Sequence, residues 1–116
     1  DMGDGSYEAA MYLTSLPNAR ELRVWSDKGA VCAMFVGDCS VSFNQKRFKA
    51  AVPDYLVLST GRRRKTTNMW SSDSVPLDFK SAYETAPAEF SLLLDNRPNN
   101  FVKVVNADTV RRVVEK

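Results

Sequence analysis

Short apolar runs alternate with turn-forming residues along most of this chain, and turn signals recur about every 8 to 12 residues. Such spacing limits each regular element to a few residues and is typical of short β-strands joined by turns. A chain of 116 residues normally forms one domain with a core of its own. We therefore predict a single globular domain over residues 1–116, mainly β or β-dominated α+β.

About seven or eight short segments carry the composition or the alternation of strands. In one of them, Val41 and Phe43 point one way while Ser40 and Ser42 point the other, as in a strand with one wet face. Segment 88–95 fits helical and strand spacing equally well, and we interpret it as a strand. The predicted strands are residues 22–26, 30–36, 39–43, 55–60, 67–71, 77–84, 88–95 and 101–105.

A short helix is predicted near each terminus. The sequence from Ser6 offers an N-cap and good helix formers, and Pro17 stops the helix. Near the other end, Asn106 can cap a final helix with valines on one face. The connections between strands look too short for crossover helices, so we expect an antiparallel meander of sandwich or barrel type.

The two cysteines, Cys32 and Cys39, lie on either side of a predicted turn at Gly37 and Asp38. A two-residue turn there leaves the sulfurs too far apart to bridge, and both cysteines are then small buried hydrophobic residues. A longer loop or a bulge brings them together. A disulfide would indicate an exported or periplasmic protein, whereas free thiols would indicate the cytoplasm, so the sequence leaves the localisation open.

The chain contains no histidine, the side chain most often used for proton transfer near neutral pH. Zinc would have only two thiols to bind, and the five glycines match no nucleotide-binding loop. Asp73, Asp78 and Glu84 remain a catalytic alternative, although acids this close in sequence usually form a solvated face. We predict that the protein is not an enzyme and has no cofactor and no metal site.

A run of four consecutive cations is the sharpest positive signal in the sequence. A hairpin tip carrying such residues can clamp phosphates while a nearby aromatic ring stacks on a base, which makes nucleic-acid binding through loop 61–70 the alternative function. The net charge of only +2 provides little general attraction for a polyanion. Such a loop also keeps a sheet edge soluble.

Tryptophan and arginine together are typical of protein interfaces, and both tryptophans lie on predicted strands where one face can be exposed. We therefore predict a non-enzymatic binding module that recognises another protein, or assembles with itself, through a sheet edge and an aromatic-basic surface. No apolar run is long enough to span a membrane. The predicted binding residues are Arg62, Arg63, Arg64, Lys65, Trp70 and Trp25.

Overall fold

Strand β3 (Tyr55–Ser59) lies at the centre of the sheet, and its residues Leu56, Val57 and Leu58 are fully buried. The computed structural model describes residues 5–41, 53–59, 86–93 and 101–114. A strand covered on both faces carries a continuous apolar run instead of an alternating one. The prediction of a buried strand at this segment is confirmed.

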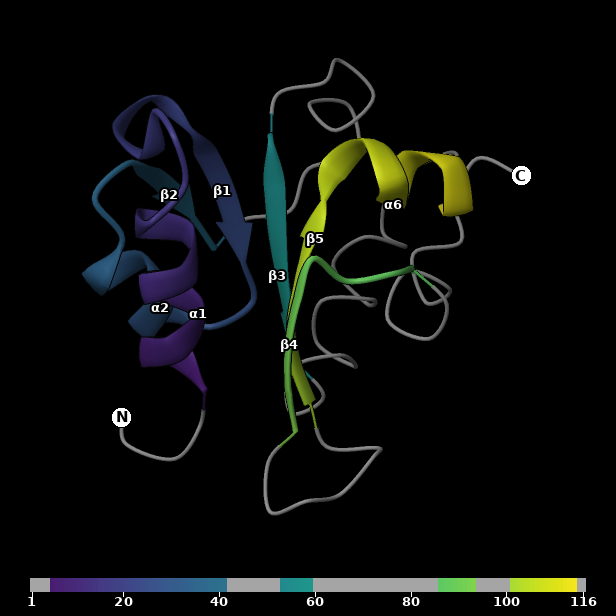
Figure 1. Ribbon diagram of the computed structural model, residues 1–116, viewed down its shortest axis with the longest axis horizontal. Coiled ribbons are helices and arrows are strands. Elements are labelled where there is room, and N and C mark those ends of the chain that lie inside the picture. The colour runs from purple at the N-terminus through teal and green to yellow at the C-terminus, as the bar shows by residue number, and fades with distance from the viewer. Residues whose placement is uncertain (1–4, 42–52, 60–85, 94–100, 115–116) are drawn as a thin grey trace.

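The described strands form an open, mixed sheet in the order β2–β1–β3–β5–β4 (Figure 1). β1 (Arg23–Ser26) runs parallel to both β2 (Asp38–Ser40) and β3. β5 (Phe101–Asn106) runs antiparallel to β3 and to β4 (Phe90–Leu93). The fold is therefore α+β, and the expectation of a purely antiparallel meander is wrong for its β2–β1–β3 part.

Helix α2 (Gly29–Met34) explains this error, because it fills the connection between the parallel strands β1 and β2. We predicted a strand over 30–36, but Val31 and Phe35 are both buried at helical spacing, and the Phe35 N–H donates to the Val31 carbonyl at 2.9 Å. A six-residue helix is thus enough for the crossover. The predicted hairpin turn at Gly37 and Asp38 is also wrong, since Asp38 begins β2.

The helices predicted near each terminus are confirmed. α1 (Ser6–Thr14) ends before Pro17, but its N-cap is Gly5, with φ of 83°, and the predicted cap Ser6 lies inside the helix. A short 3-10 helix, η1 (Ala19–Glu21), follows α1. At the start of α6 (Ala107–Val114), the Asn106 Oδ1 accepts the Asp108 N–H at 2.9 Å, as predicted for the final cap.

Helices cover the sheet unevenly. α1 and α2 lie on one side and α6 on the other (Figure 1). The core between the sheet and the first two helices consists of small and branched apolar side chains that allow close packing. Its buried members are Ala9, Ala10, Leu13, Ala19, Val24, Val31, Phe35, Val57, Val102 and Val104.

Segment 88–95, which fitted both spacings, contains strand β4, so our interpretation is confirmed. The predicted strands at 67–71 and 77–84 lie outside the described residues. In the part of the chain that the structure describes, no helix is long and apolar enough to cross a membrane.

Gly37 is expected to be essential for the turn into β2. A Cβ at this position would lie 2.5 Å from the Ala19 carbonyl oxygen and 2.9 Å from that of Leu22, and backbone atoms cannot easily move away. Gly37→Ala should therefore lower the free energy of unfolding by about 1–3 kcal/mol, measured by denaturant titration.

Gly29→Ala provides the matched control, because no atom lies within 4 Å of the Cβ it would add and the residue begins a helix. We expect it to raise the free energy of unfolding by about 0.4–1 kcal/mol. Equal effects of the two substitutions would contradict this account of Gly37.

Candidate functional site

Two strands, β2 and β4, lie at the edges of the described sheet. An outer strand offers N–H and C=O groups on its free side that can pair with another chain. β4 pairs with β5 alone among the described strands, and its residues alternate between half-buried and exposed. Leu93 is 49% exposed, which is high for a large aliphatic side chain at a sheet edge.

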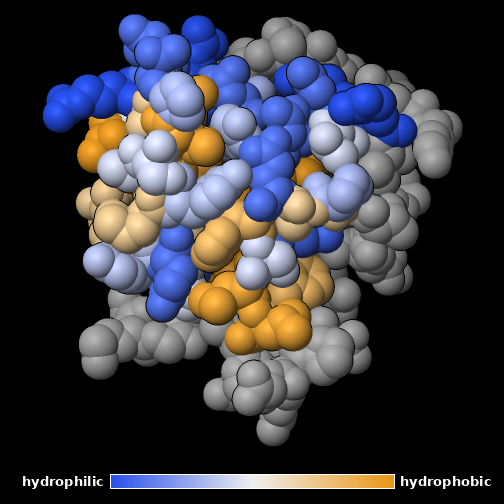
Figure 2. Space-filling model, in the orientation of Figure 1, coloured by the Kyte–Doolittle hydropathy of each residue, from blue (hydrophilic) through white to orange (hydrophobic). Residues whose placement is uncertain are grey.

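Hydrophobic side chains gather over β4 on the face shown in Figure 2. Phe90 stacks on Tyr12 of α1, with ring centroids 5.0 Å apart. Leu92 pairs with the buried Val102 and lies beside Gly5 at the start of α1. α1 therefore supports one face of β4, and no described strand pairs with its outer side.

The carboxylate of Glu89 lies just before the first residue of β4. The Glu89 N–H donates to the Val104 carbonyl at 2.9 Å, which fixes the backbone, and the Tyr12 hydroxyl donates to Glu89 Oε1 at 3.2 Å. Burial raises the pKa of Tyr12 and Tyr55, and the negative charge of Glu89 and its hydrogen bonding raise the pKa of each further. Glu89 thus lies between two tyrosines on the surface beside β4.

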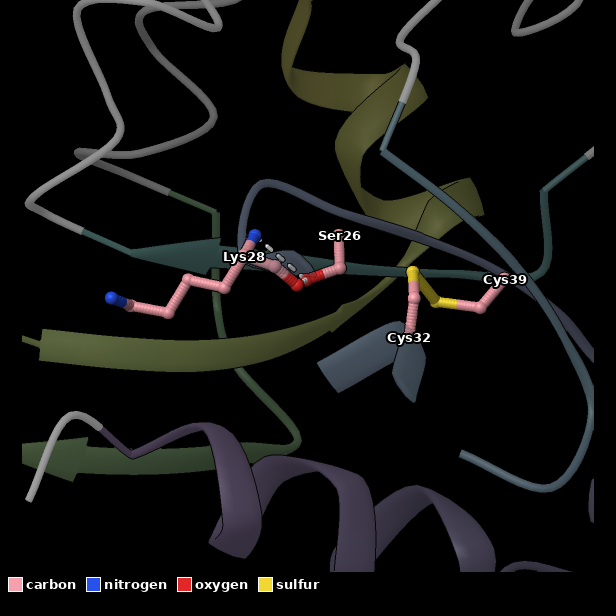
Figure 3. The surroundings of a disulfide bond; sticks show 4 residues. All are labelled: Ser26, Lys28, Cys32 and Cys39. Atoms are coloured by element: carbon pink, nitrogen blue, oxygen red, sulfur yellow. Dashed lines mark hydrogen bonds between the residues drawn. A yellow bond between two sulfur atoms is a disulfide. The ribbon is translucent and has the colours of Figure 1, made fainter. Parts of the chain in front are cut away.

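The other edge, β2, is covalently tied. A disulfide joins Cys32 of α2 to Cys39 of β2, with Cα atoms 5.1 Å apart, close to Ser26 and Lys28 at the end of β1 (Figure 3). The interpretation of the cysteines as separate buried residues is wrong, because a helix and not a strand carries Cys32. β2 is short, and the disulfide binds it to the helix beside it.

Polar groups meet at the carboxyl ends of β1 and β3. The Ser59 N–H and hydroxyl donate to the two carboxylate oxygens of Asp27 at 2.7 and 2.9 Å. Ser26 accepts the Lys28 N–H and donates to its carbonyl. These bonds hold the two strand ends together. In the sequence, the basic run begins three residues after Ser59.

The opposite ends of these strands border a hollow of about 390 Å³. Its charged groups are used in structural contacts: Asp54 accepts the Arg23 N–H at 2.9 Å, and Arg111 binds Asp108 and the Pro53 carbonyl. Within the described ranges, no three side chains of the metal-binding types lie close enough together to hold a metal ion. The described residues that line the hollow include no Ser, Thr or Cys that could act as a nucleophile.

Lys103 is the one charged side chain buried among the described residues. Its ammonium donates to the Ala86 carbonyl at 3.0 Å and lies 5.2 Å from the centre of the Phe101 ring. Burial lowers its pKa. Lys103 therefore tethers the segment before β4 to β5.

Of the sequence-predicted binding residues, the structure describes Trp25 alone. Trp25 lies on β1 and is only 3% exposed, so the expected exposed ring is wrong. Packing explains this, since β1 is an inner strand between β2 and β3. The remaining predicted residues lie outside the described residues: Arg62, Arg63, Arg64, Lys65 and Trp70.

Sequence reasoning missed Glu89, Tyr12 and Leu93. The alternation within segment 88–95 gave the only available signal, because it predicts a strand but not that the strand lies at an edge. Comparison of the chain with protein-family models, with curated proteins and with solved structures found no match. The function is therefore argued from the geometry of the site.

Replacing Glu89 by Gln is expected to lower the pKa of Tyr12 and of Tyr55 toward the ordinary value of 10.0, because the charge that opposes phenolate formation is removed. In the wild type, the folded state keeps protons that the unfolded chain loses above pH 10.0. As the pH rises from this value through the pKa values of Tyr12 and Tyr55 in the folded state, the free energy of unfolding should therefore fall. The decrease should be smaller in E89Q than in the wild type.

Phenolate absorbance measured against pH gives the pKa values of the two tyrosines. Single Tyr→Phe variants show which pKa belongs to which tyrosine. Glu21→Gln, on η1, is the control and should leave both tyrosines unchanged. Superimposable titration curves for the wild type and E89Q would show that Glu89 has no influence on the tyrosines.

Proposed function

We propose that this protein is a non-enzymatic binding module that takes an extended segment of another protein, or of a second copy, as an added strand along β4. The observation that carries the proposal is the edge itself: among the described strands β4 pairs with β5 alone, Leu93 is 49% exposed, and hydrophobic side chains gather over the strand (Figure 2). Strand addition combines main-chain hydrogen bonds with contacts of alternate side chains.

The composition of β4 favours this strand over β2, the other edge strand, as the binding site. Natural edge strands are commonly protected by charges, proline, bulges or extreme shortness. β4 carries Phe90, Ser91, Leu92 and Leu93, with no charged residue within the strand. β2 has only three residues, begins with Asp38 and is tied to α2 by the disulfide.

The lack of histidine and the use of charged groups in structural bonds also support binding over catalysis. The described carboxylates Asp27 and Asp54 accept hydrogen bonds from the backbone, and Asp108 is paired with Arg111. An oxidising compartment is part of the proposal, because disulfides such as Cys32–Cys39 persist mainly in exported or periplasmic proteins.

Leu93→Lys is expected to weaken strand binding by about tenfold or more, because a lysine on an edge strand opposes pairing with another strand. The probes are peptides about ten residues long, selected on the wild-type protein from a random displayed library and measured by fluorescence anisotropy. The free energy of unfolding should change by less than about 0.5 kcal/mol, because the side chain is half exposed.

Val41→Lys is the matched control, since Val41 is also 49% exposed but follows the other edge strand. It should bind the selected peptides as the wild type does. Loss of binding in V41K but not in L93K would move the site to β2. Light scattering on the same variants shows whether any self-association depends on Leu93.

The basic run is proposed to extend the binding surface. Replacing its four cations together by Ser should leave the melting temperature nearly unchanged and weaken partner binding, because charges near an interface steer association. Loss of the fold in this variant would show that the run is structural. The substituted residues are Arg62, Arg63, Arg64 and Lys65.

Nucleic-acid binding remains the alternative function, and the same run of cations is the observation that favours it. Titration of a labelled single-stranded oligonucleotide at about 20 mM and about 150 mM salt separates the two functions. Micromolar binding with a steep salt dependence, lost in the four-Ser variant, would favour the alternative. Absence of binding at low salt would exclude it.

A further inference from the structure

Glu89 is an exposed acid at the beginning of the outer strand, and its charge is not neutralised by a described cation. The salt bridge found among the described residues joins Arg111 to Asp108, and none joins Glu89. Its hydrogen-bond partners are instead neutral phenols: Tyr12, which donates to Oε1, and Tyr55, whose pKa is raised by hydrogen bonding to Glu89. Within the described ranges, no cation therefore neutralises this carboxylate beside β4.

The position of this carboxylate is fixed before any partner arrives. The backbone N–H of Glu89 is bonded to Val104, its Oε1 is bonded to Tyr12, and the Tyr12 ring is stacked on Phe90. A held acceptor loses little conformational entropy on binding. The two rings beside it also offer apolar surface to the methylene stem of a long cationic side chain.

We propose that Glu89 selects the partner of β4 by binding a Lys or Arg side chain of the added strand. This inference rests on the proposed strand addition and states which kind of added strand β4 prefers. Oppositely charged residues facing each other across two strands attract, and a charged hydrogen bond is stronger than a neutral one. The partner is thus an extended apolar segment of another protein with one basic residue opposite Glu89.

A second copy of β4 does not meet this requirement. Antiparallel pairing of two β4 strands about Ser91 sets Glu89 against Leu93 of the second copy, which carries no charge. Pairing about Glu89 itself sets two carboxylates opposite each other, and like charges in that position are destabilising. The charge pattern of β4 therefore favours a different protein over self-pairing at this edge.

Selections from the displayed peptide library on three proteins test the inference. On the wild type, Lys or Arg should be enriched at one fixed position of the apolar peptides. On E89Q, which keeps an oxygen to accept from Tyr12 but removes the charge, this enrichment should vanish. On E89K, Asp or Glu should be enriched at the same position. Glu21→Gln is the control and should reproduce the wild-type preference.

One selected peptide and its Lys→Gln version then measure the effect directly. We expect the Lys peptide to bind the wild type about three- to tenfold more tightly at about 50 mM salt and to lose this advantage on E89Q. The advantage should also shrink at higher salt, since the pair lies at the surface.

The outcomes separate the two proposals. Strand addition stands, and the role of Glu89 is overturned, if the selected peptides fail to bind L93K but contain no enriched Lys or Arg. The same conclusion follows if peptides selected on E89Q keep the basic preference. Peptides that bind L93K as well as the wild type overturn strand addition at β4, and the role of Glu89 with it.

Discussion

Burial of β3 on both faces is the constraint on which the rest of the structure depends. Leu56, Val57 and Leu58 are fully removed from water, and each such side chain contributes roughly 1.5–3 kcal/mol relative to exposure. Alternate residues of a strand point to opposite faces, so this burial requires cover on both sides of the sheet. It also requires a strand on each side of β3, which β1 and β5 provide.

β3 lies at the centre of the described sheet, with two strands on either side. β2 and β4 lie at the two ends of the strand order, and different contacts hold each of them in place. A disulfide holds β2 against α2, whereas β4 contacts α1 on one face, where its Phe90 ring stacks on Tyr12. The open edge, the apolar surface over it and the fixed acid at its start together motivate the proposed strand binding.

Electrostatic interactions elsewhere in the described structure serve the fold. Asp27 ties the end of β1 to the end of β3 through Ser59, and Lys103 holds the segment before β4 through the Ala86 carbonyl. Buried polar groups need such partners because an unpaired one is costly. Glu89 differs from these groups because it is exposed beside an edge strand that pairs with β5 alone among the described strands.

Local sequence alone determined several elements of this protein: the apolar run of β3, the helices near both ends, the cap at Asn106 and the strand in segment 88–95. Each depends on neighbours within a few residues. Only the tertiary structure decided that 30–36 is largely helical, that β1 and β2 are parallel, that Cys32 meets Cys39 and that Trp25 is buried. Short apolar runs suit a helix or a strand equally, and the choice is made by which arrangement buries them against the sheet. The edge position of β4 follows from that global packing. The local sequence does not show that β4 is an edge strand, so it could not predict the candidate site.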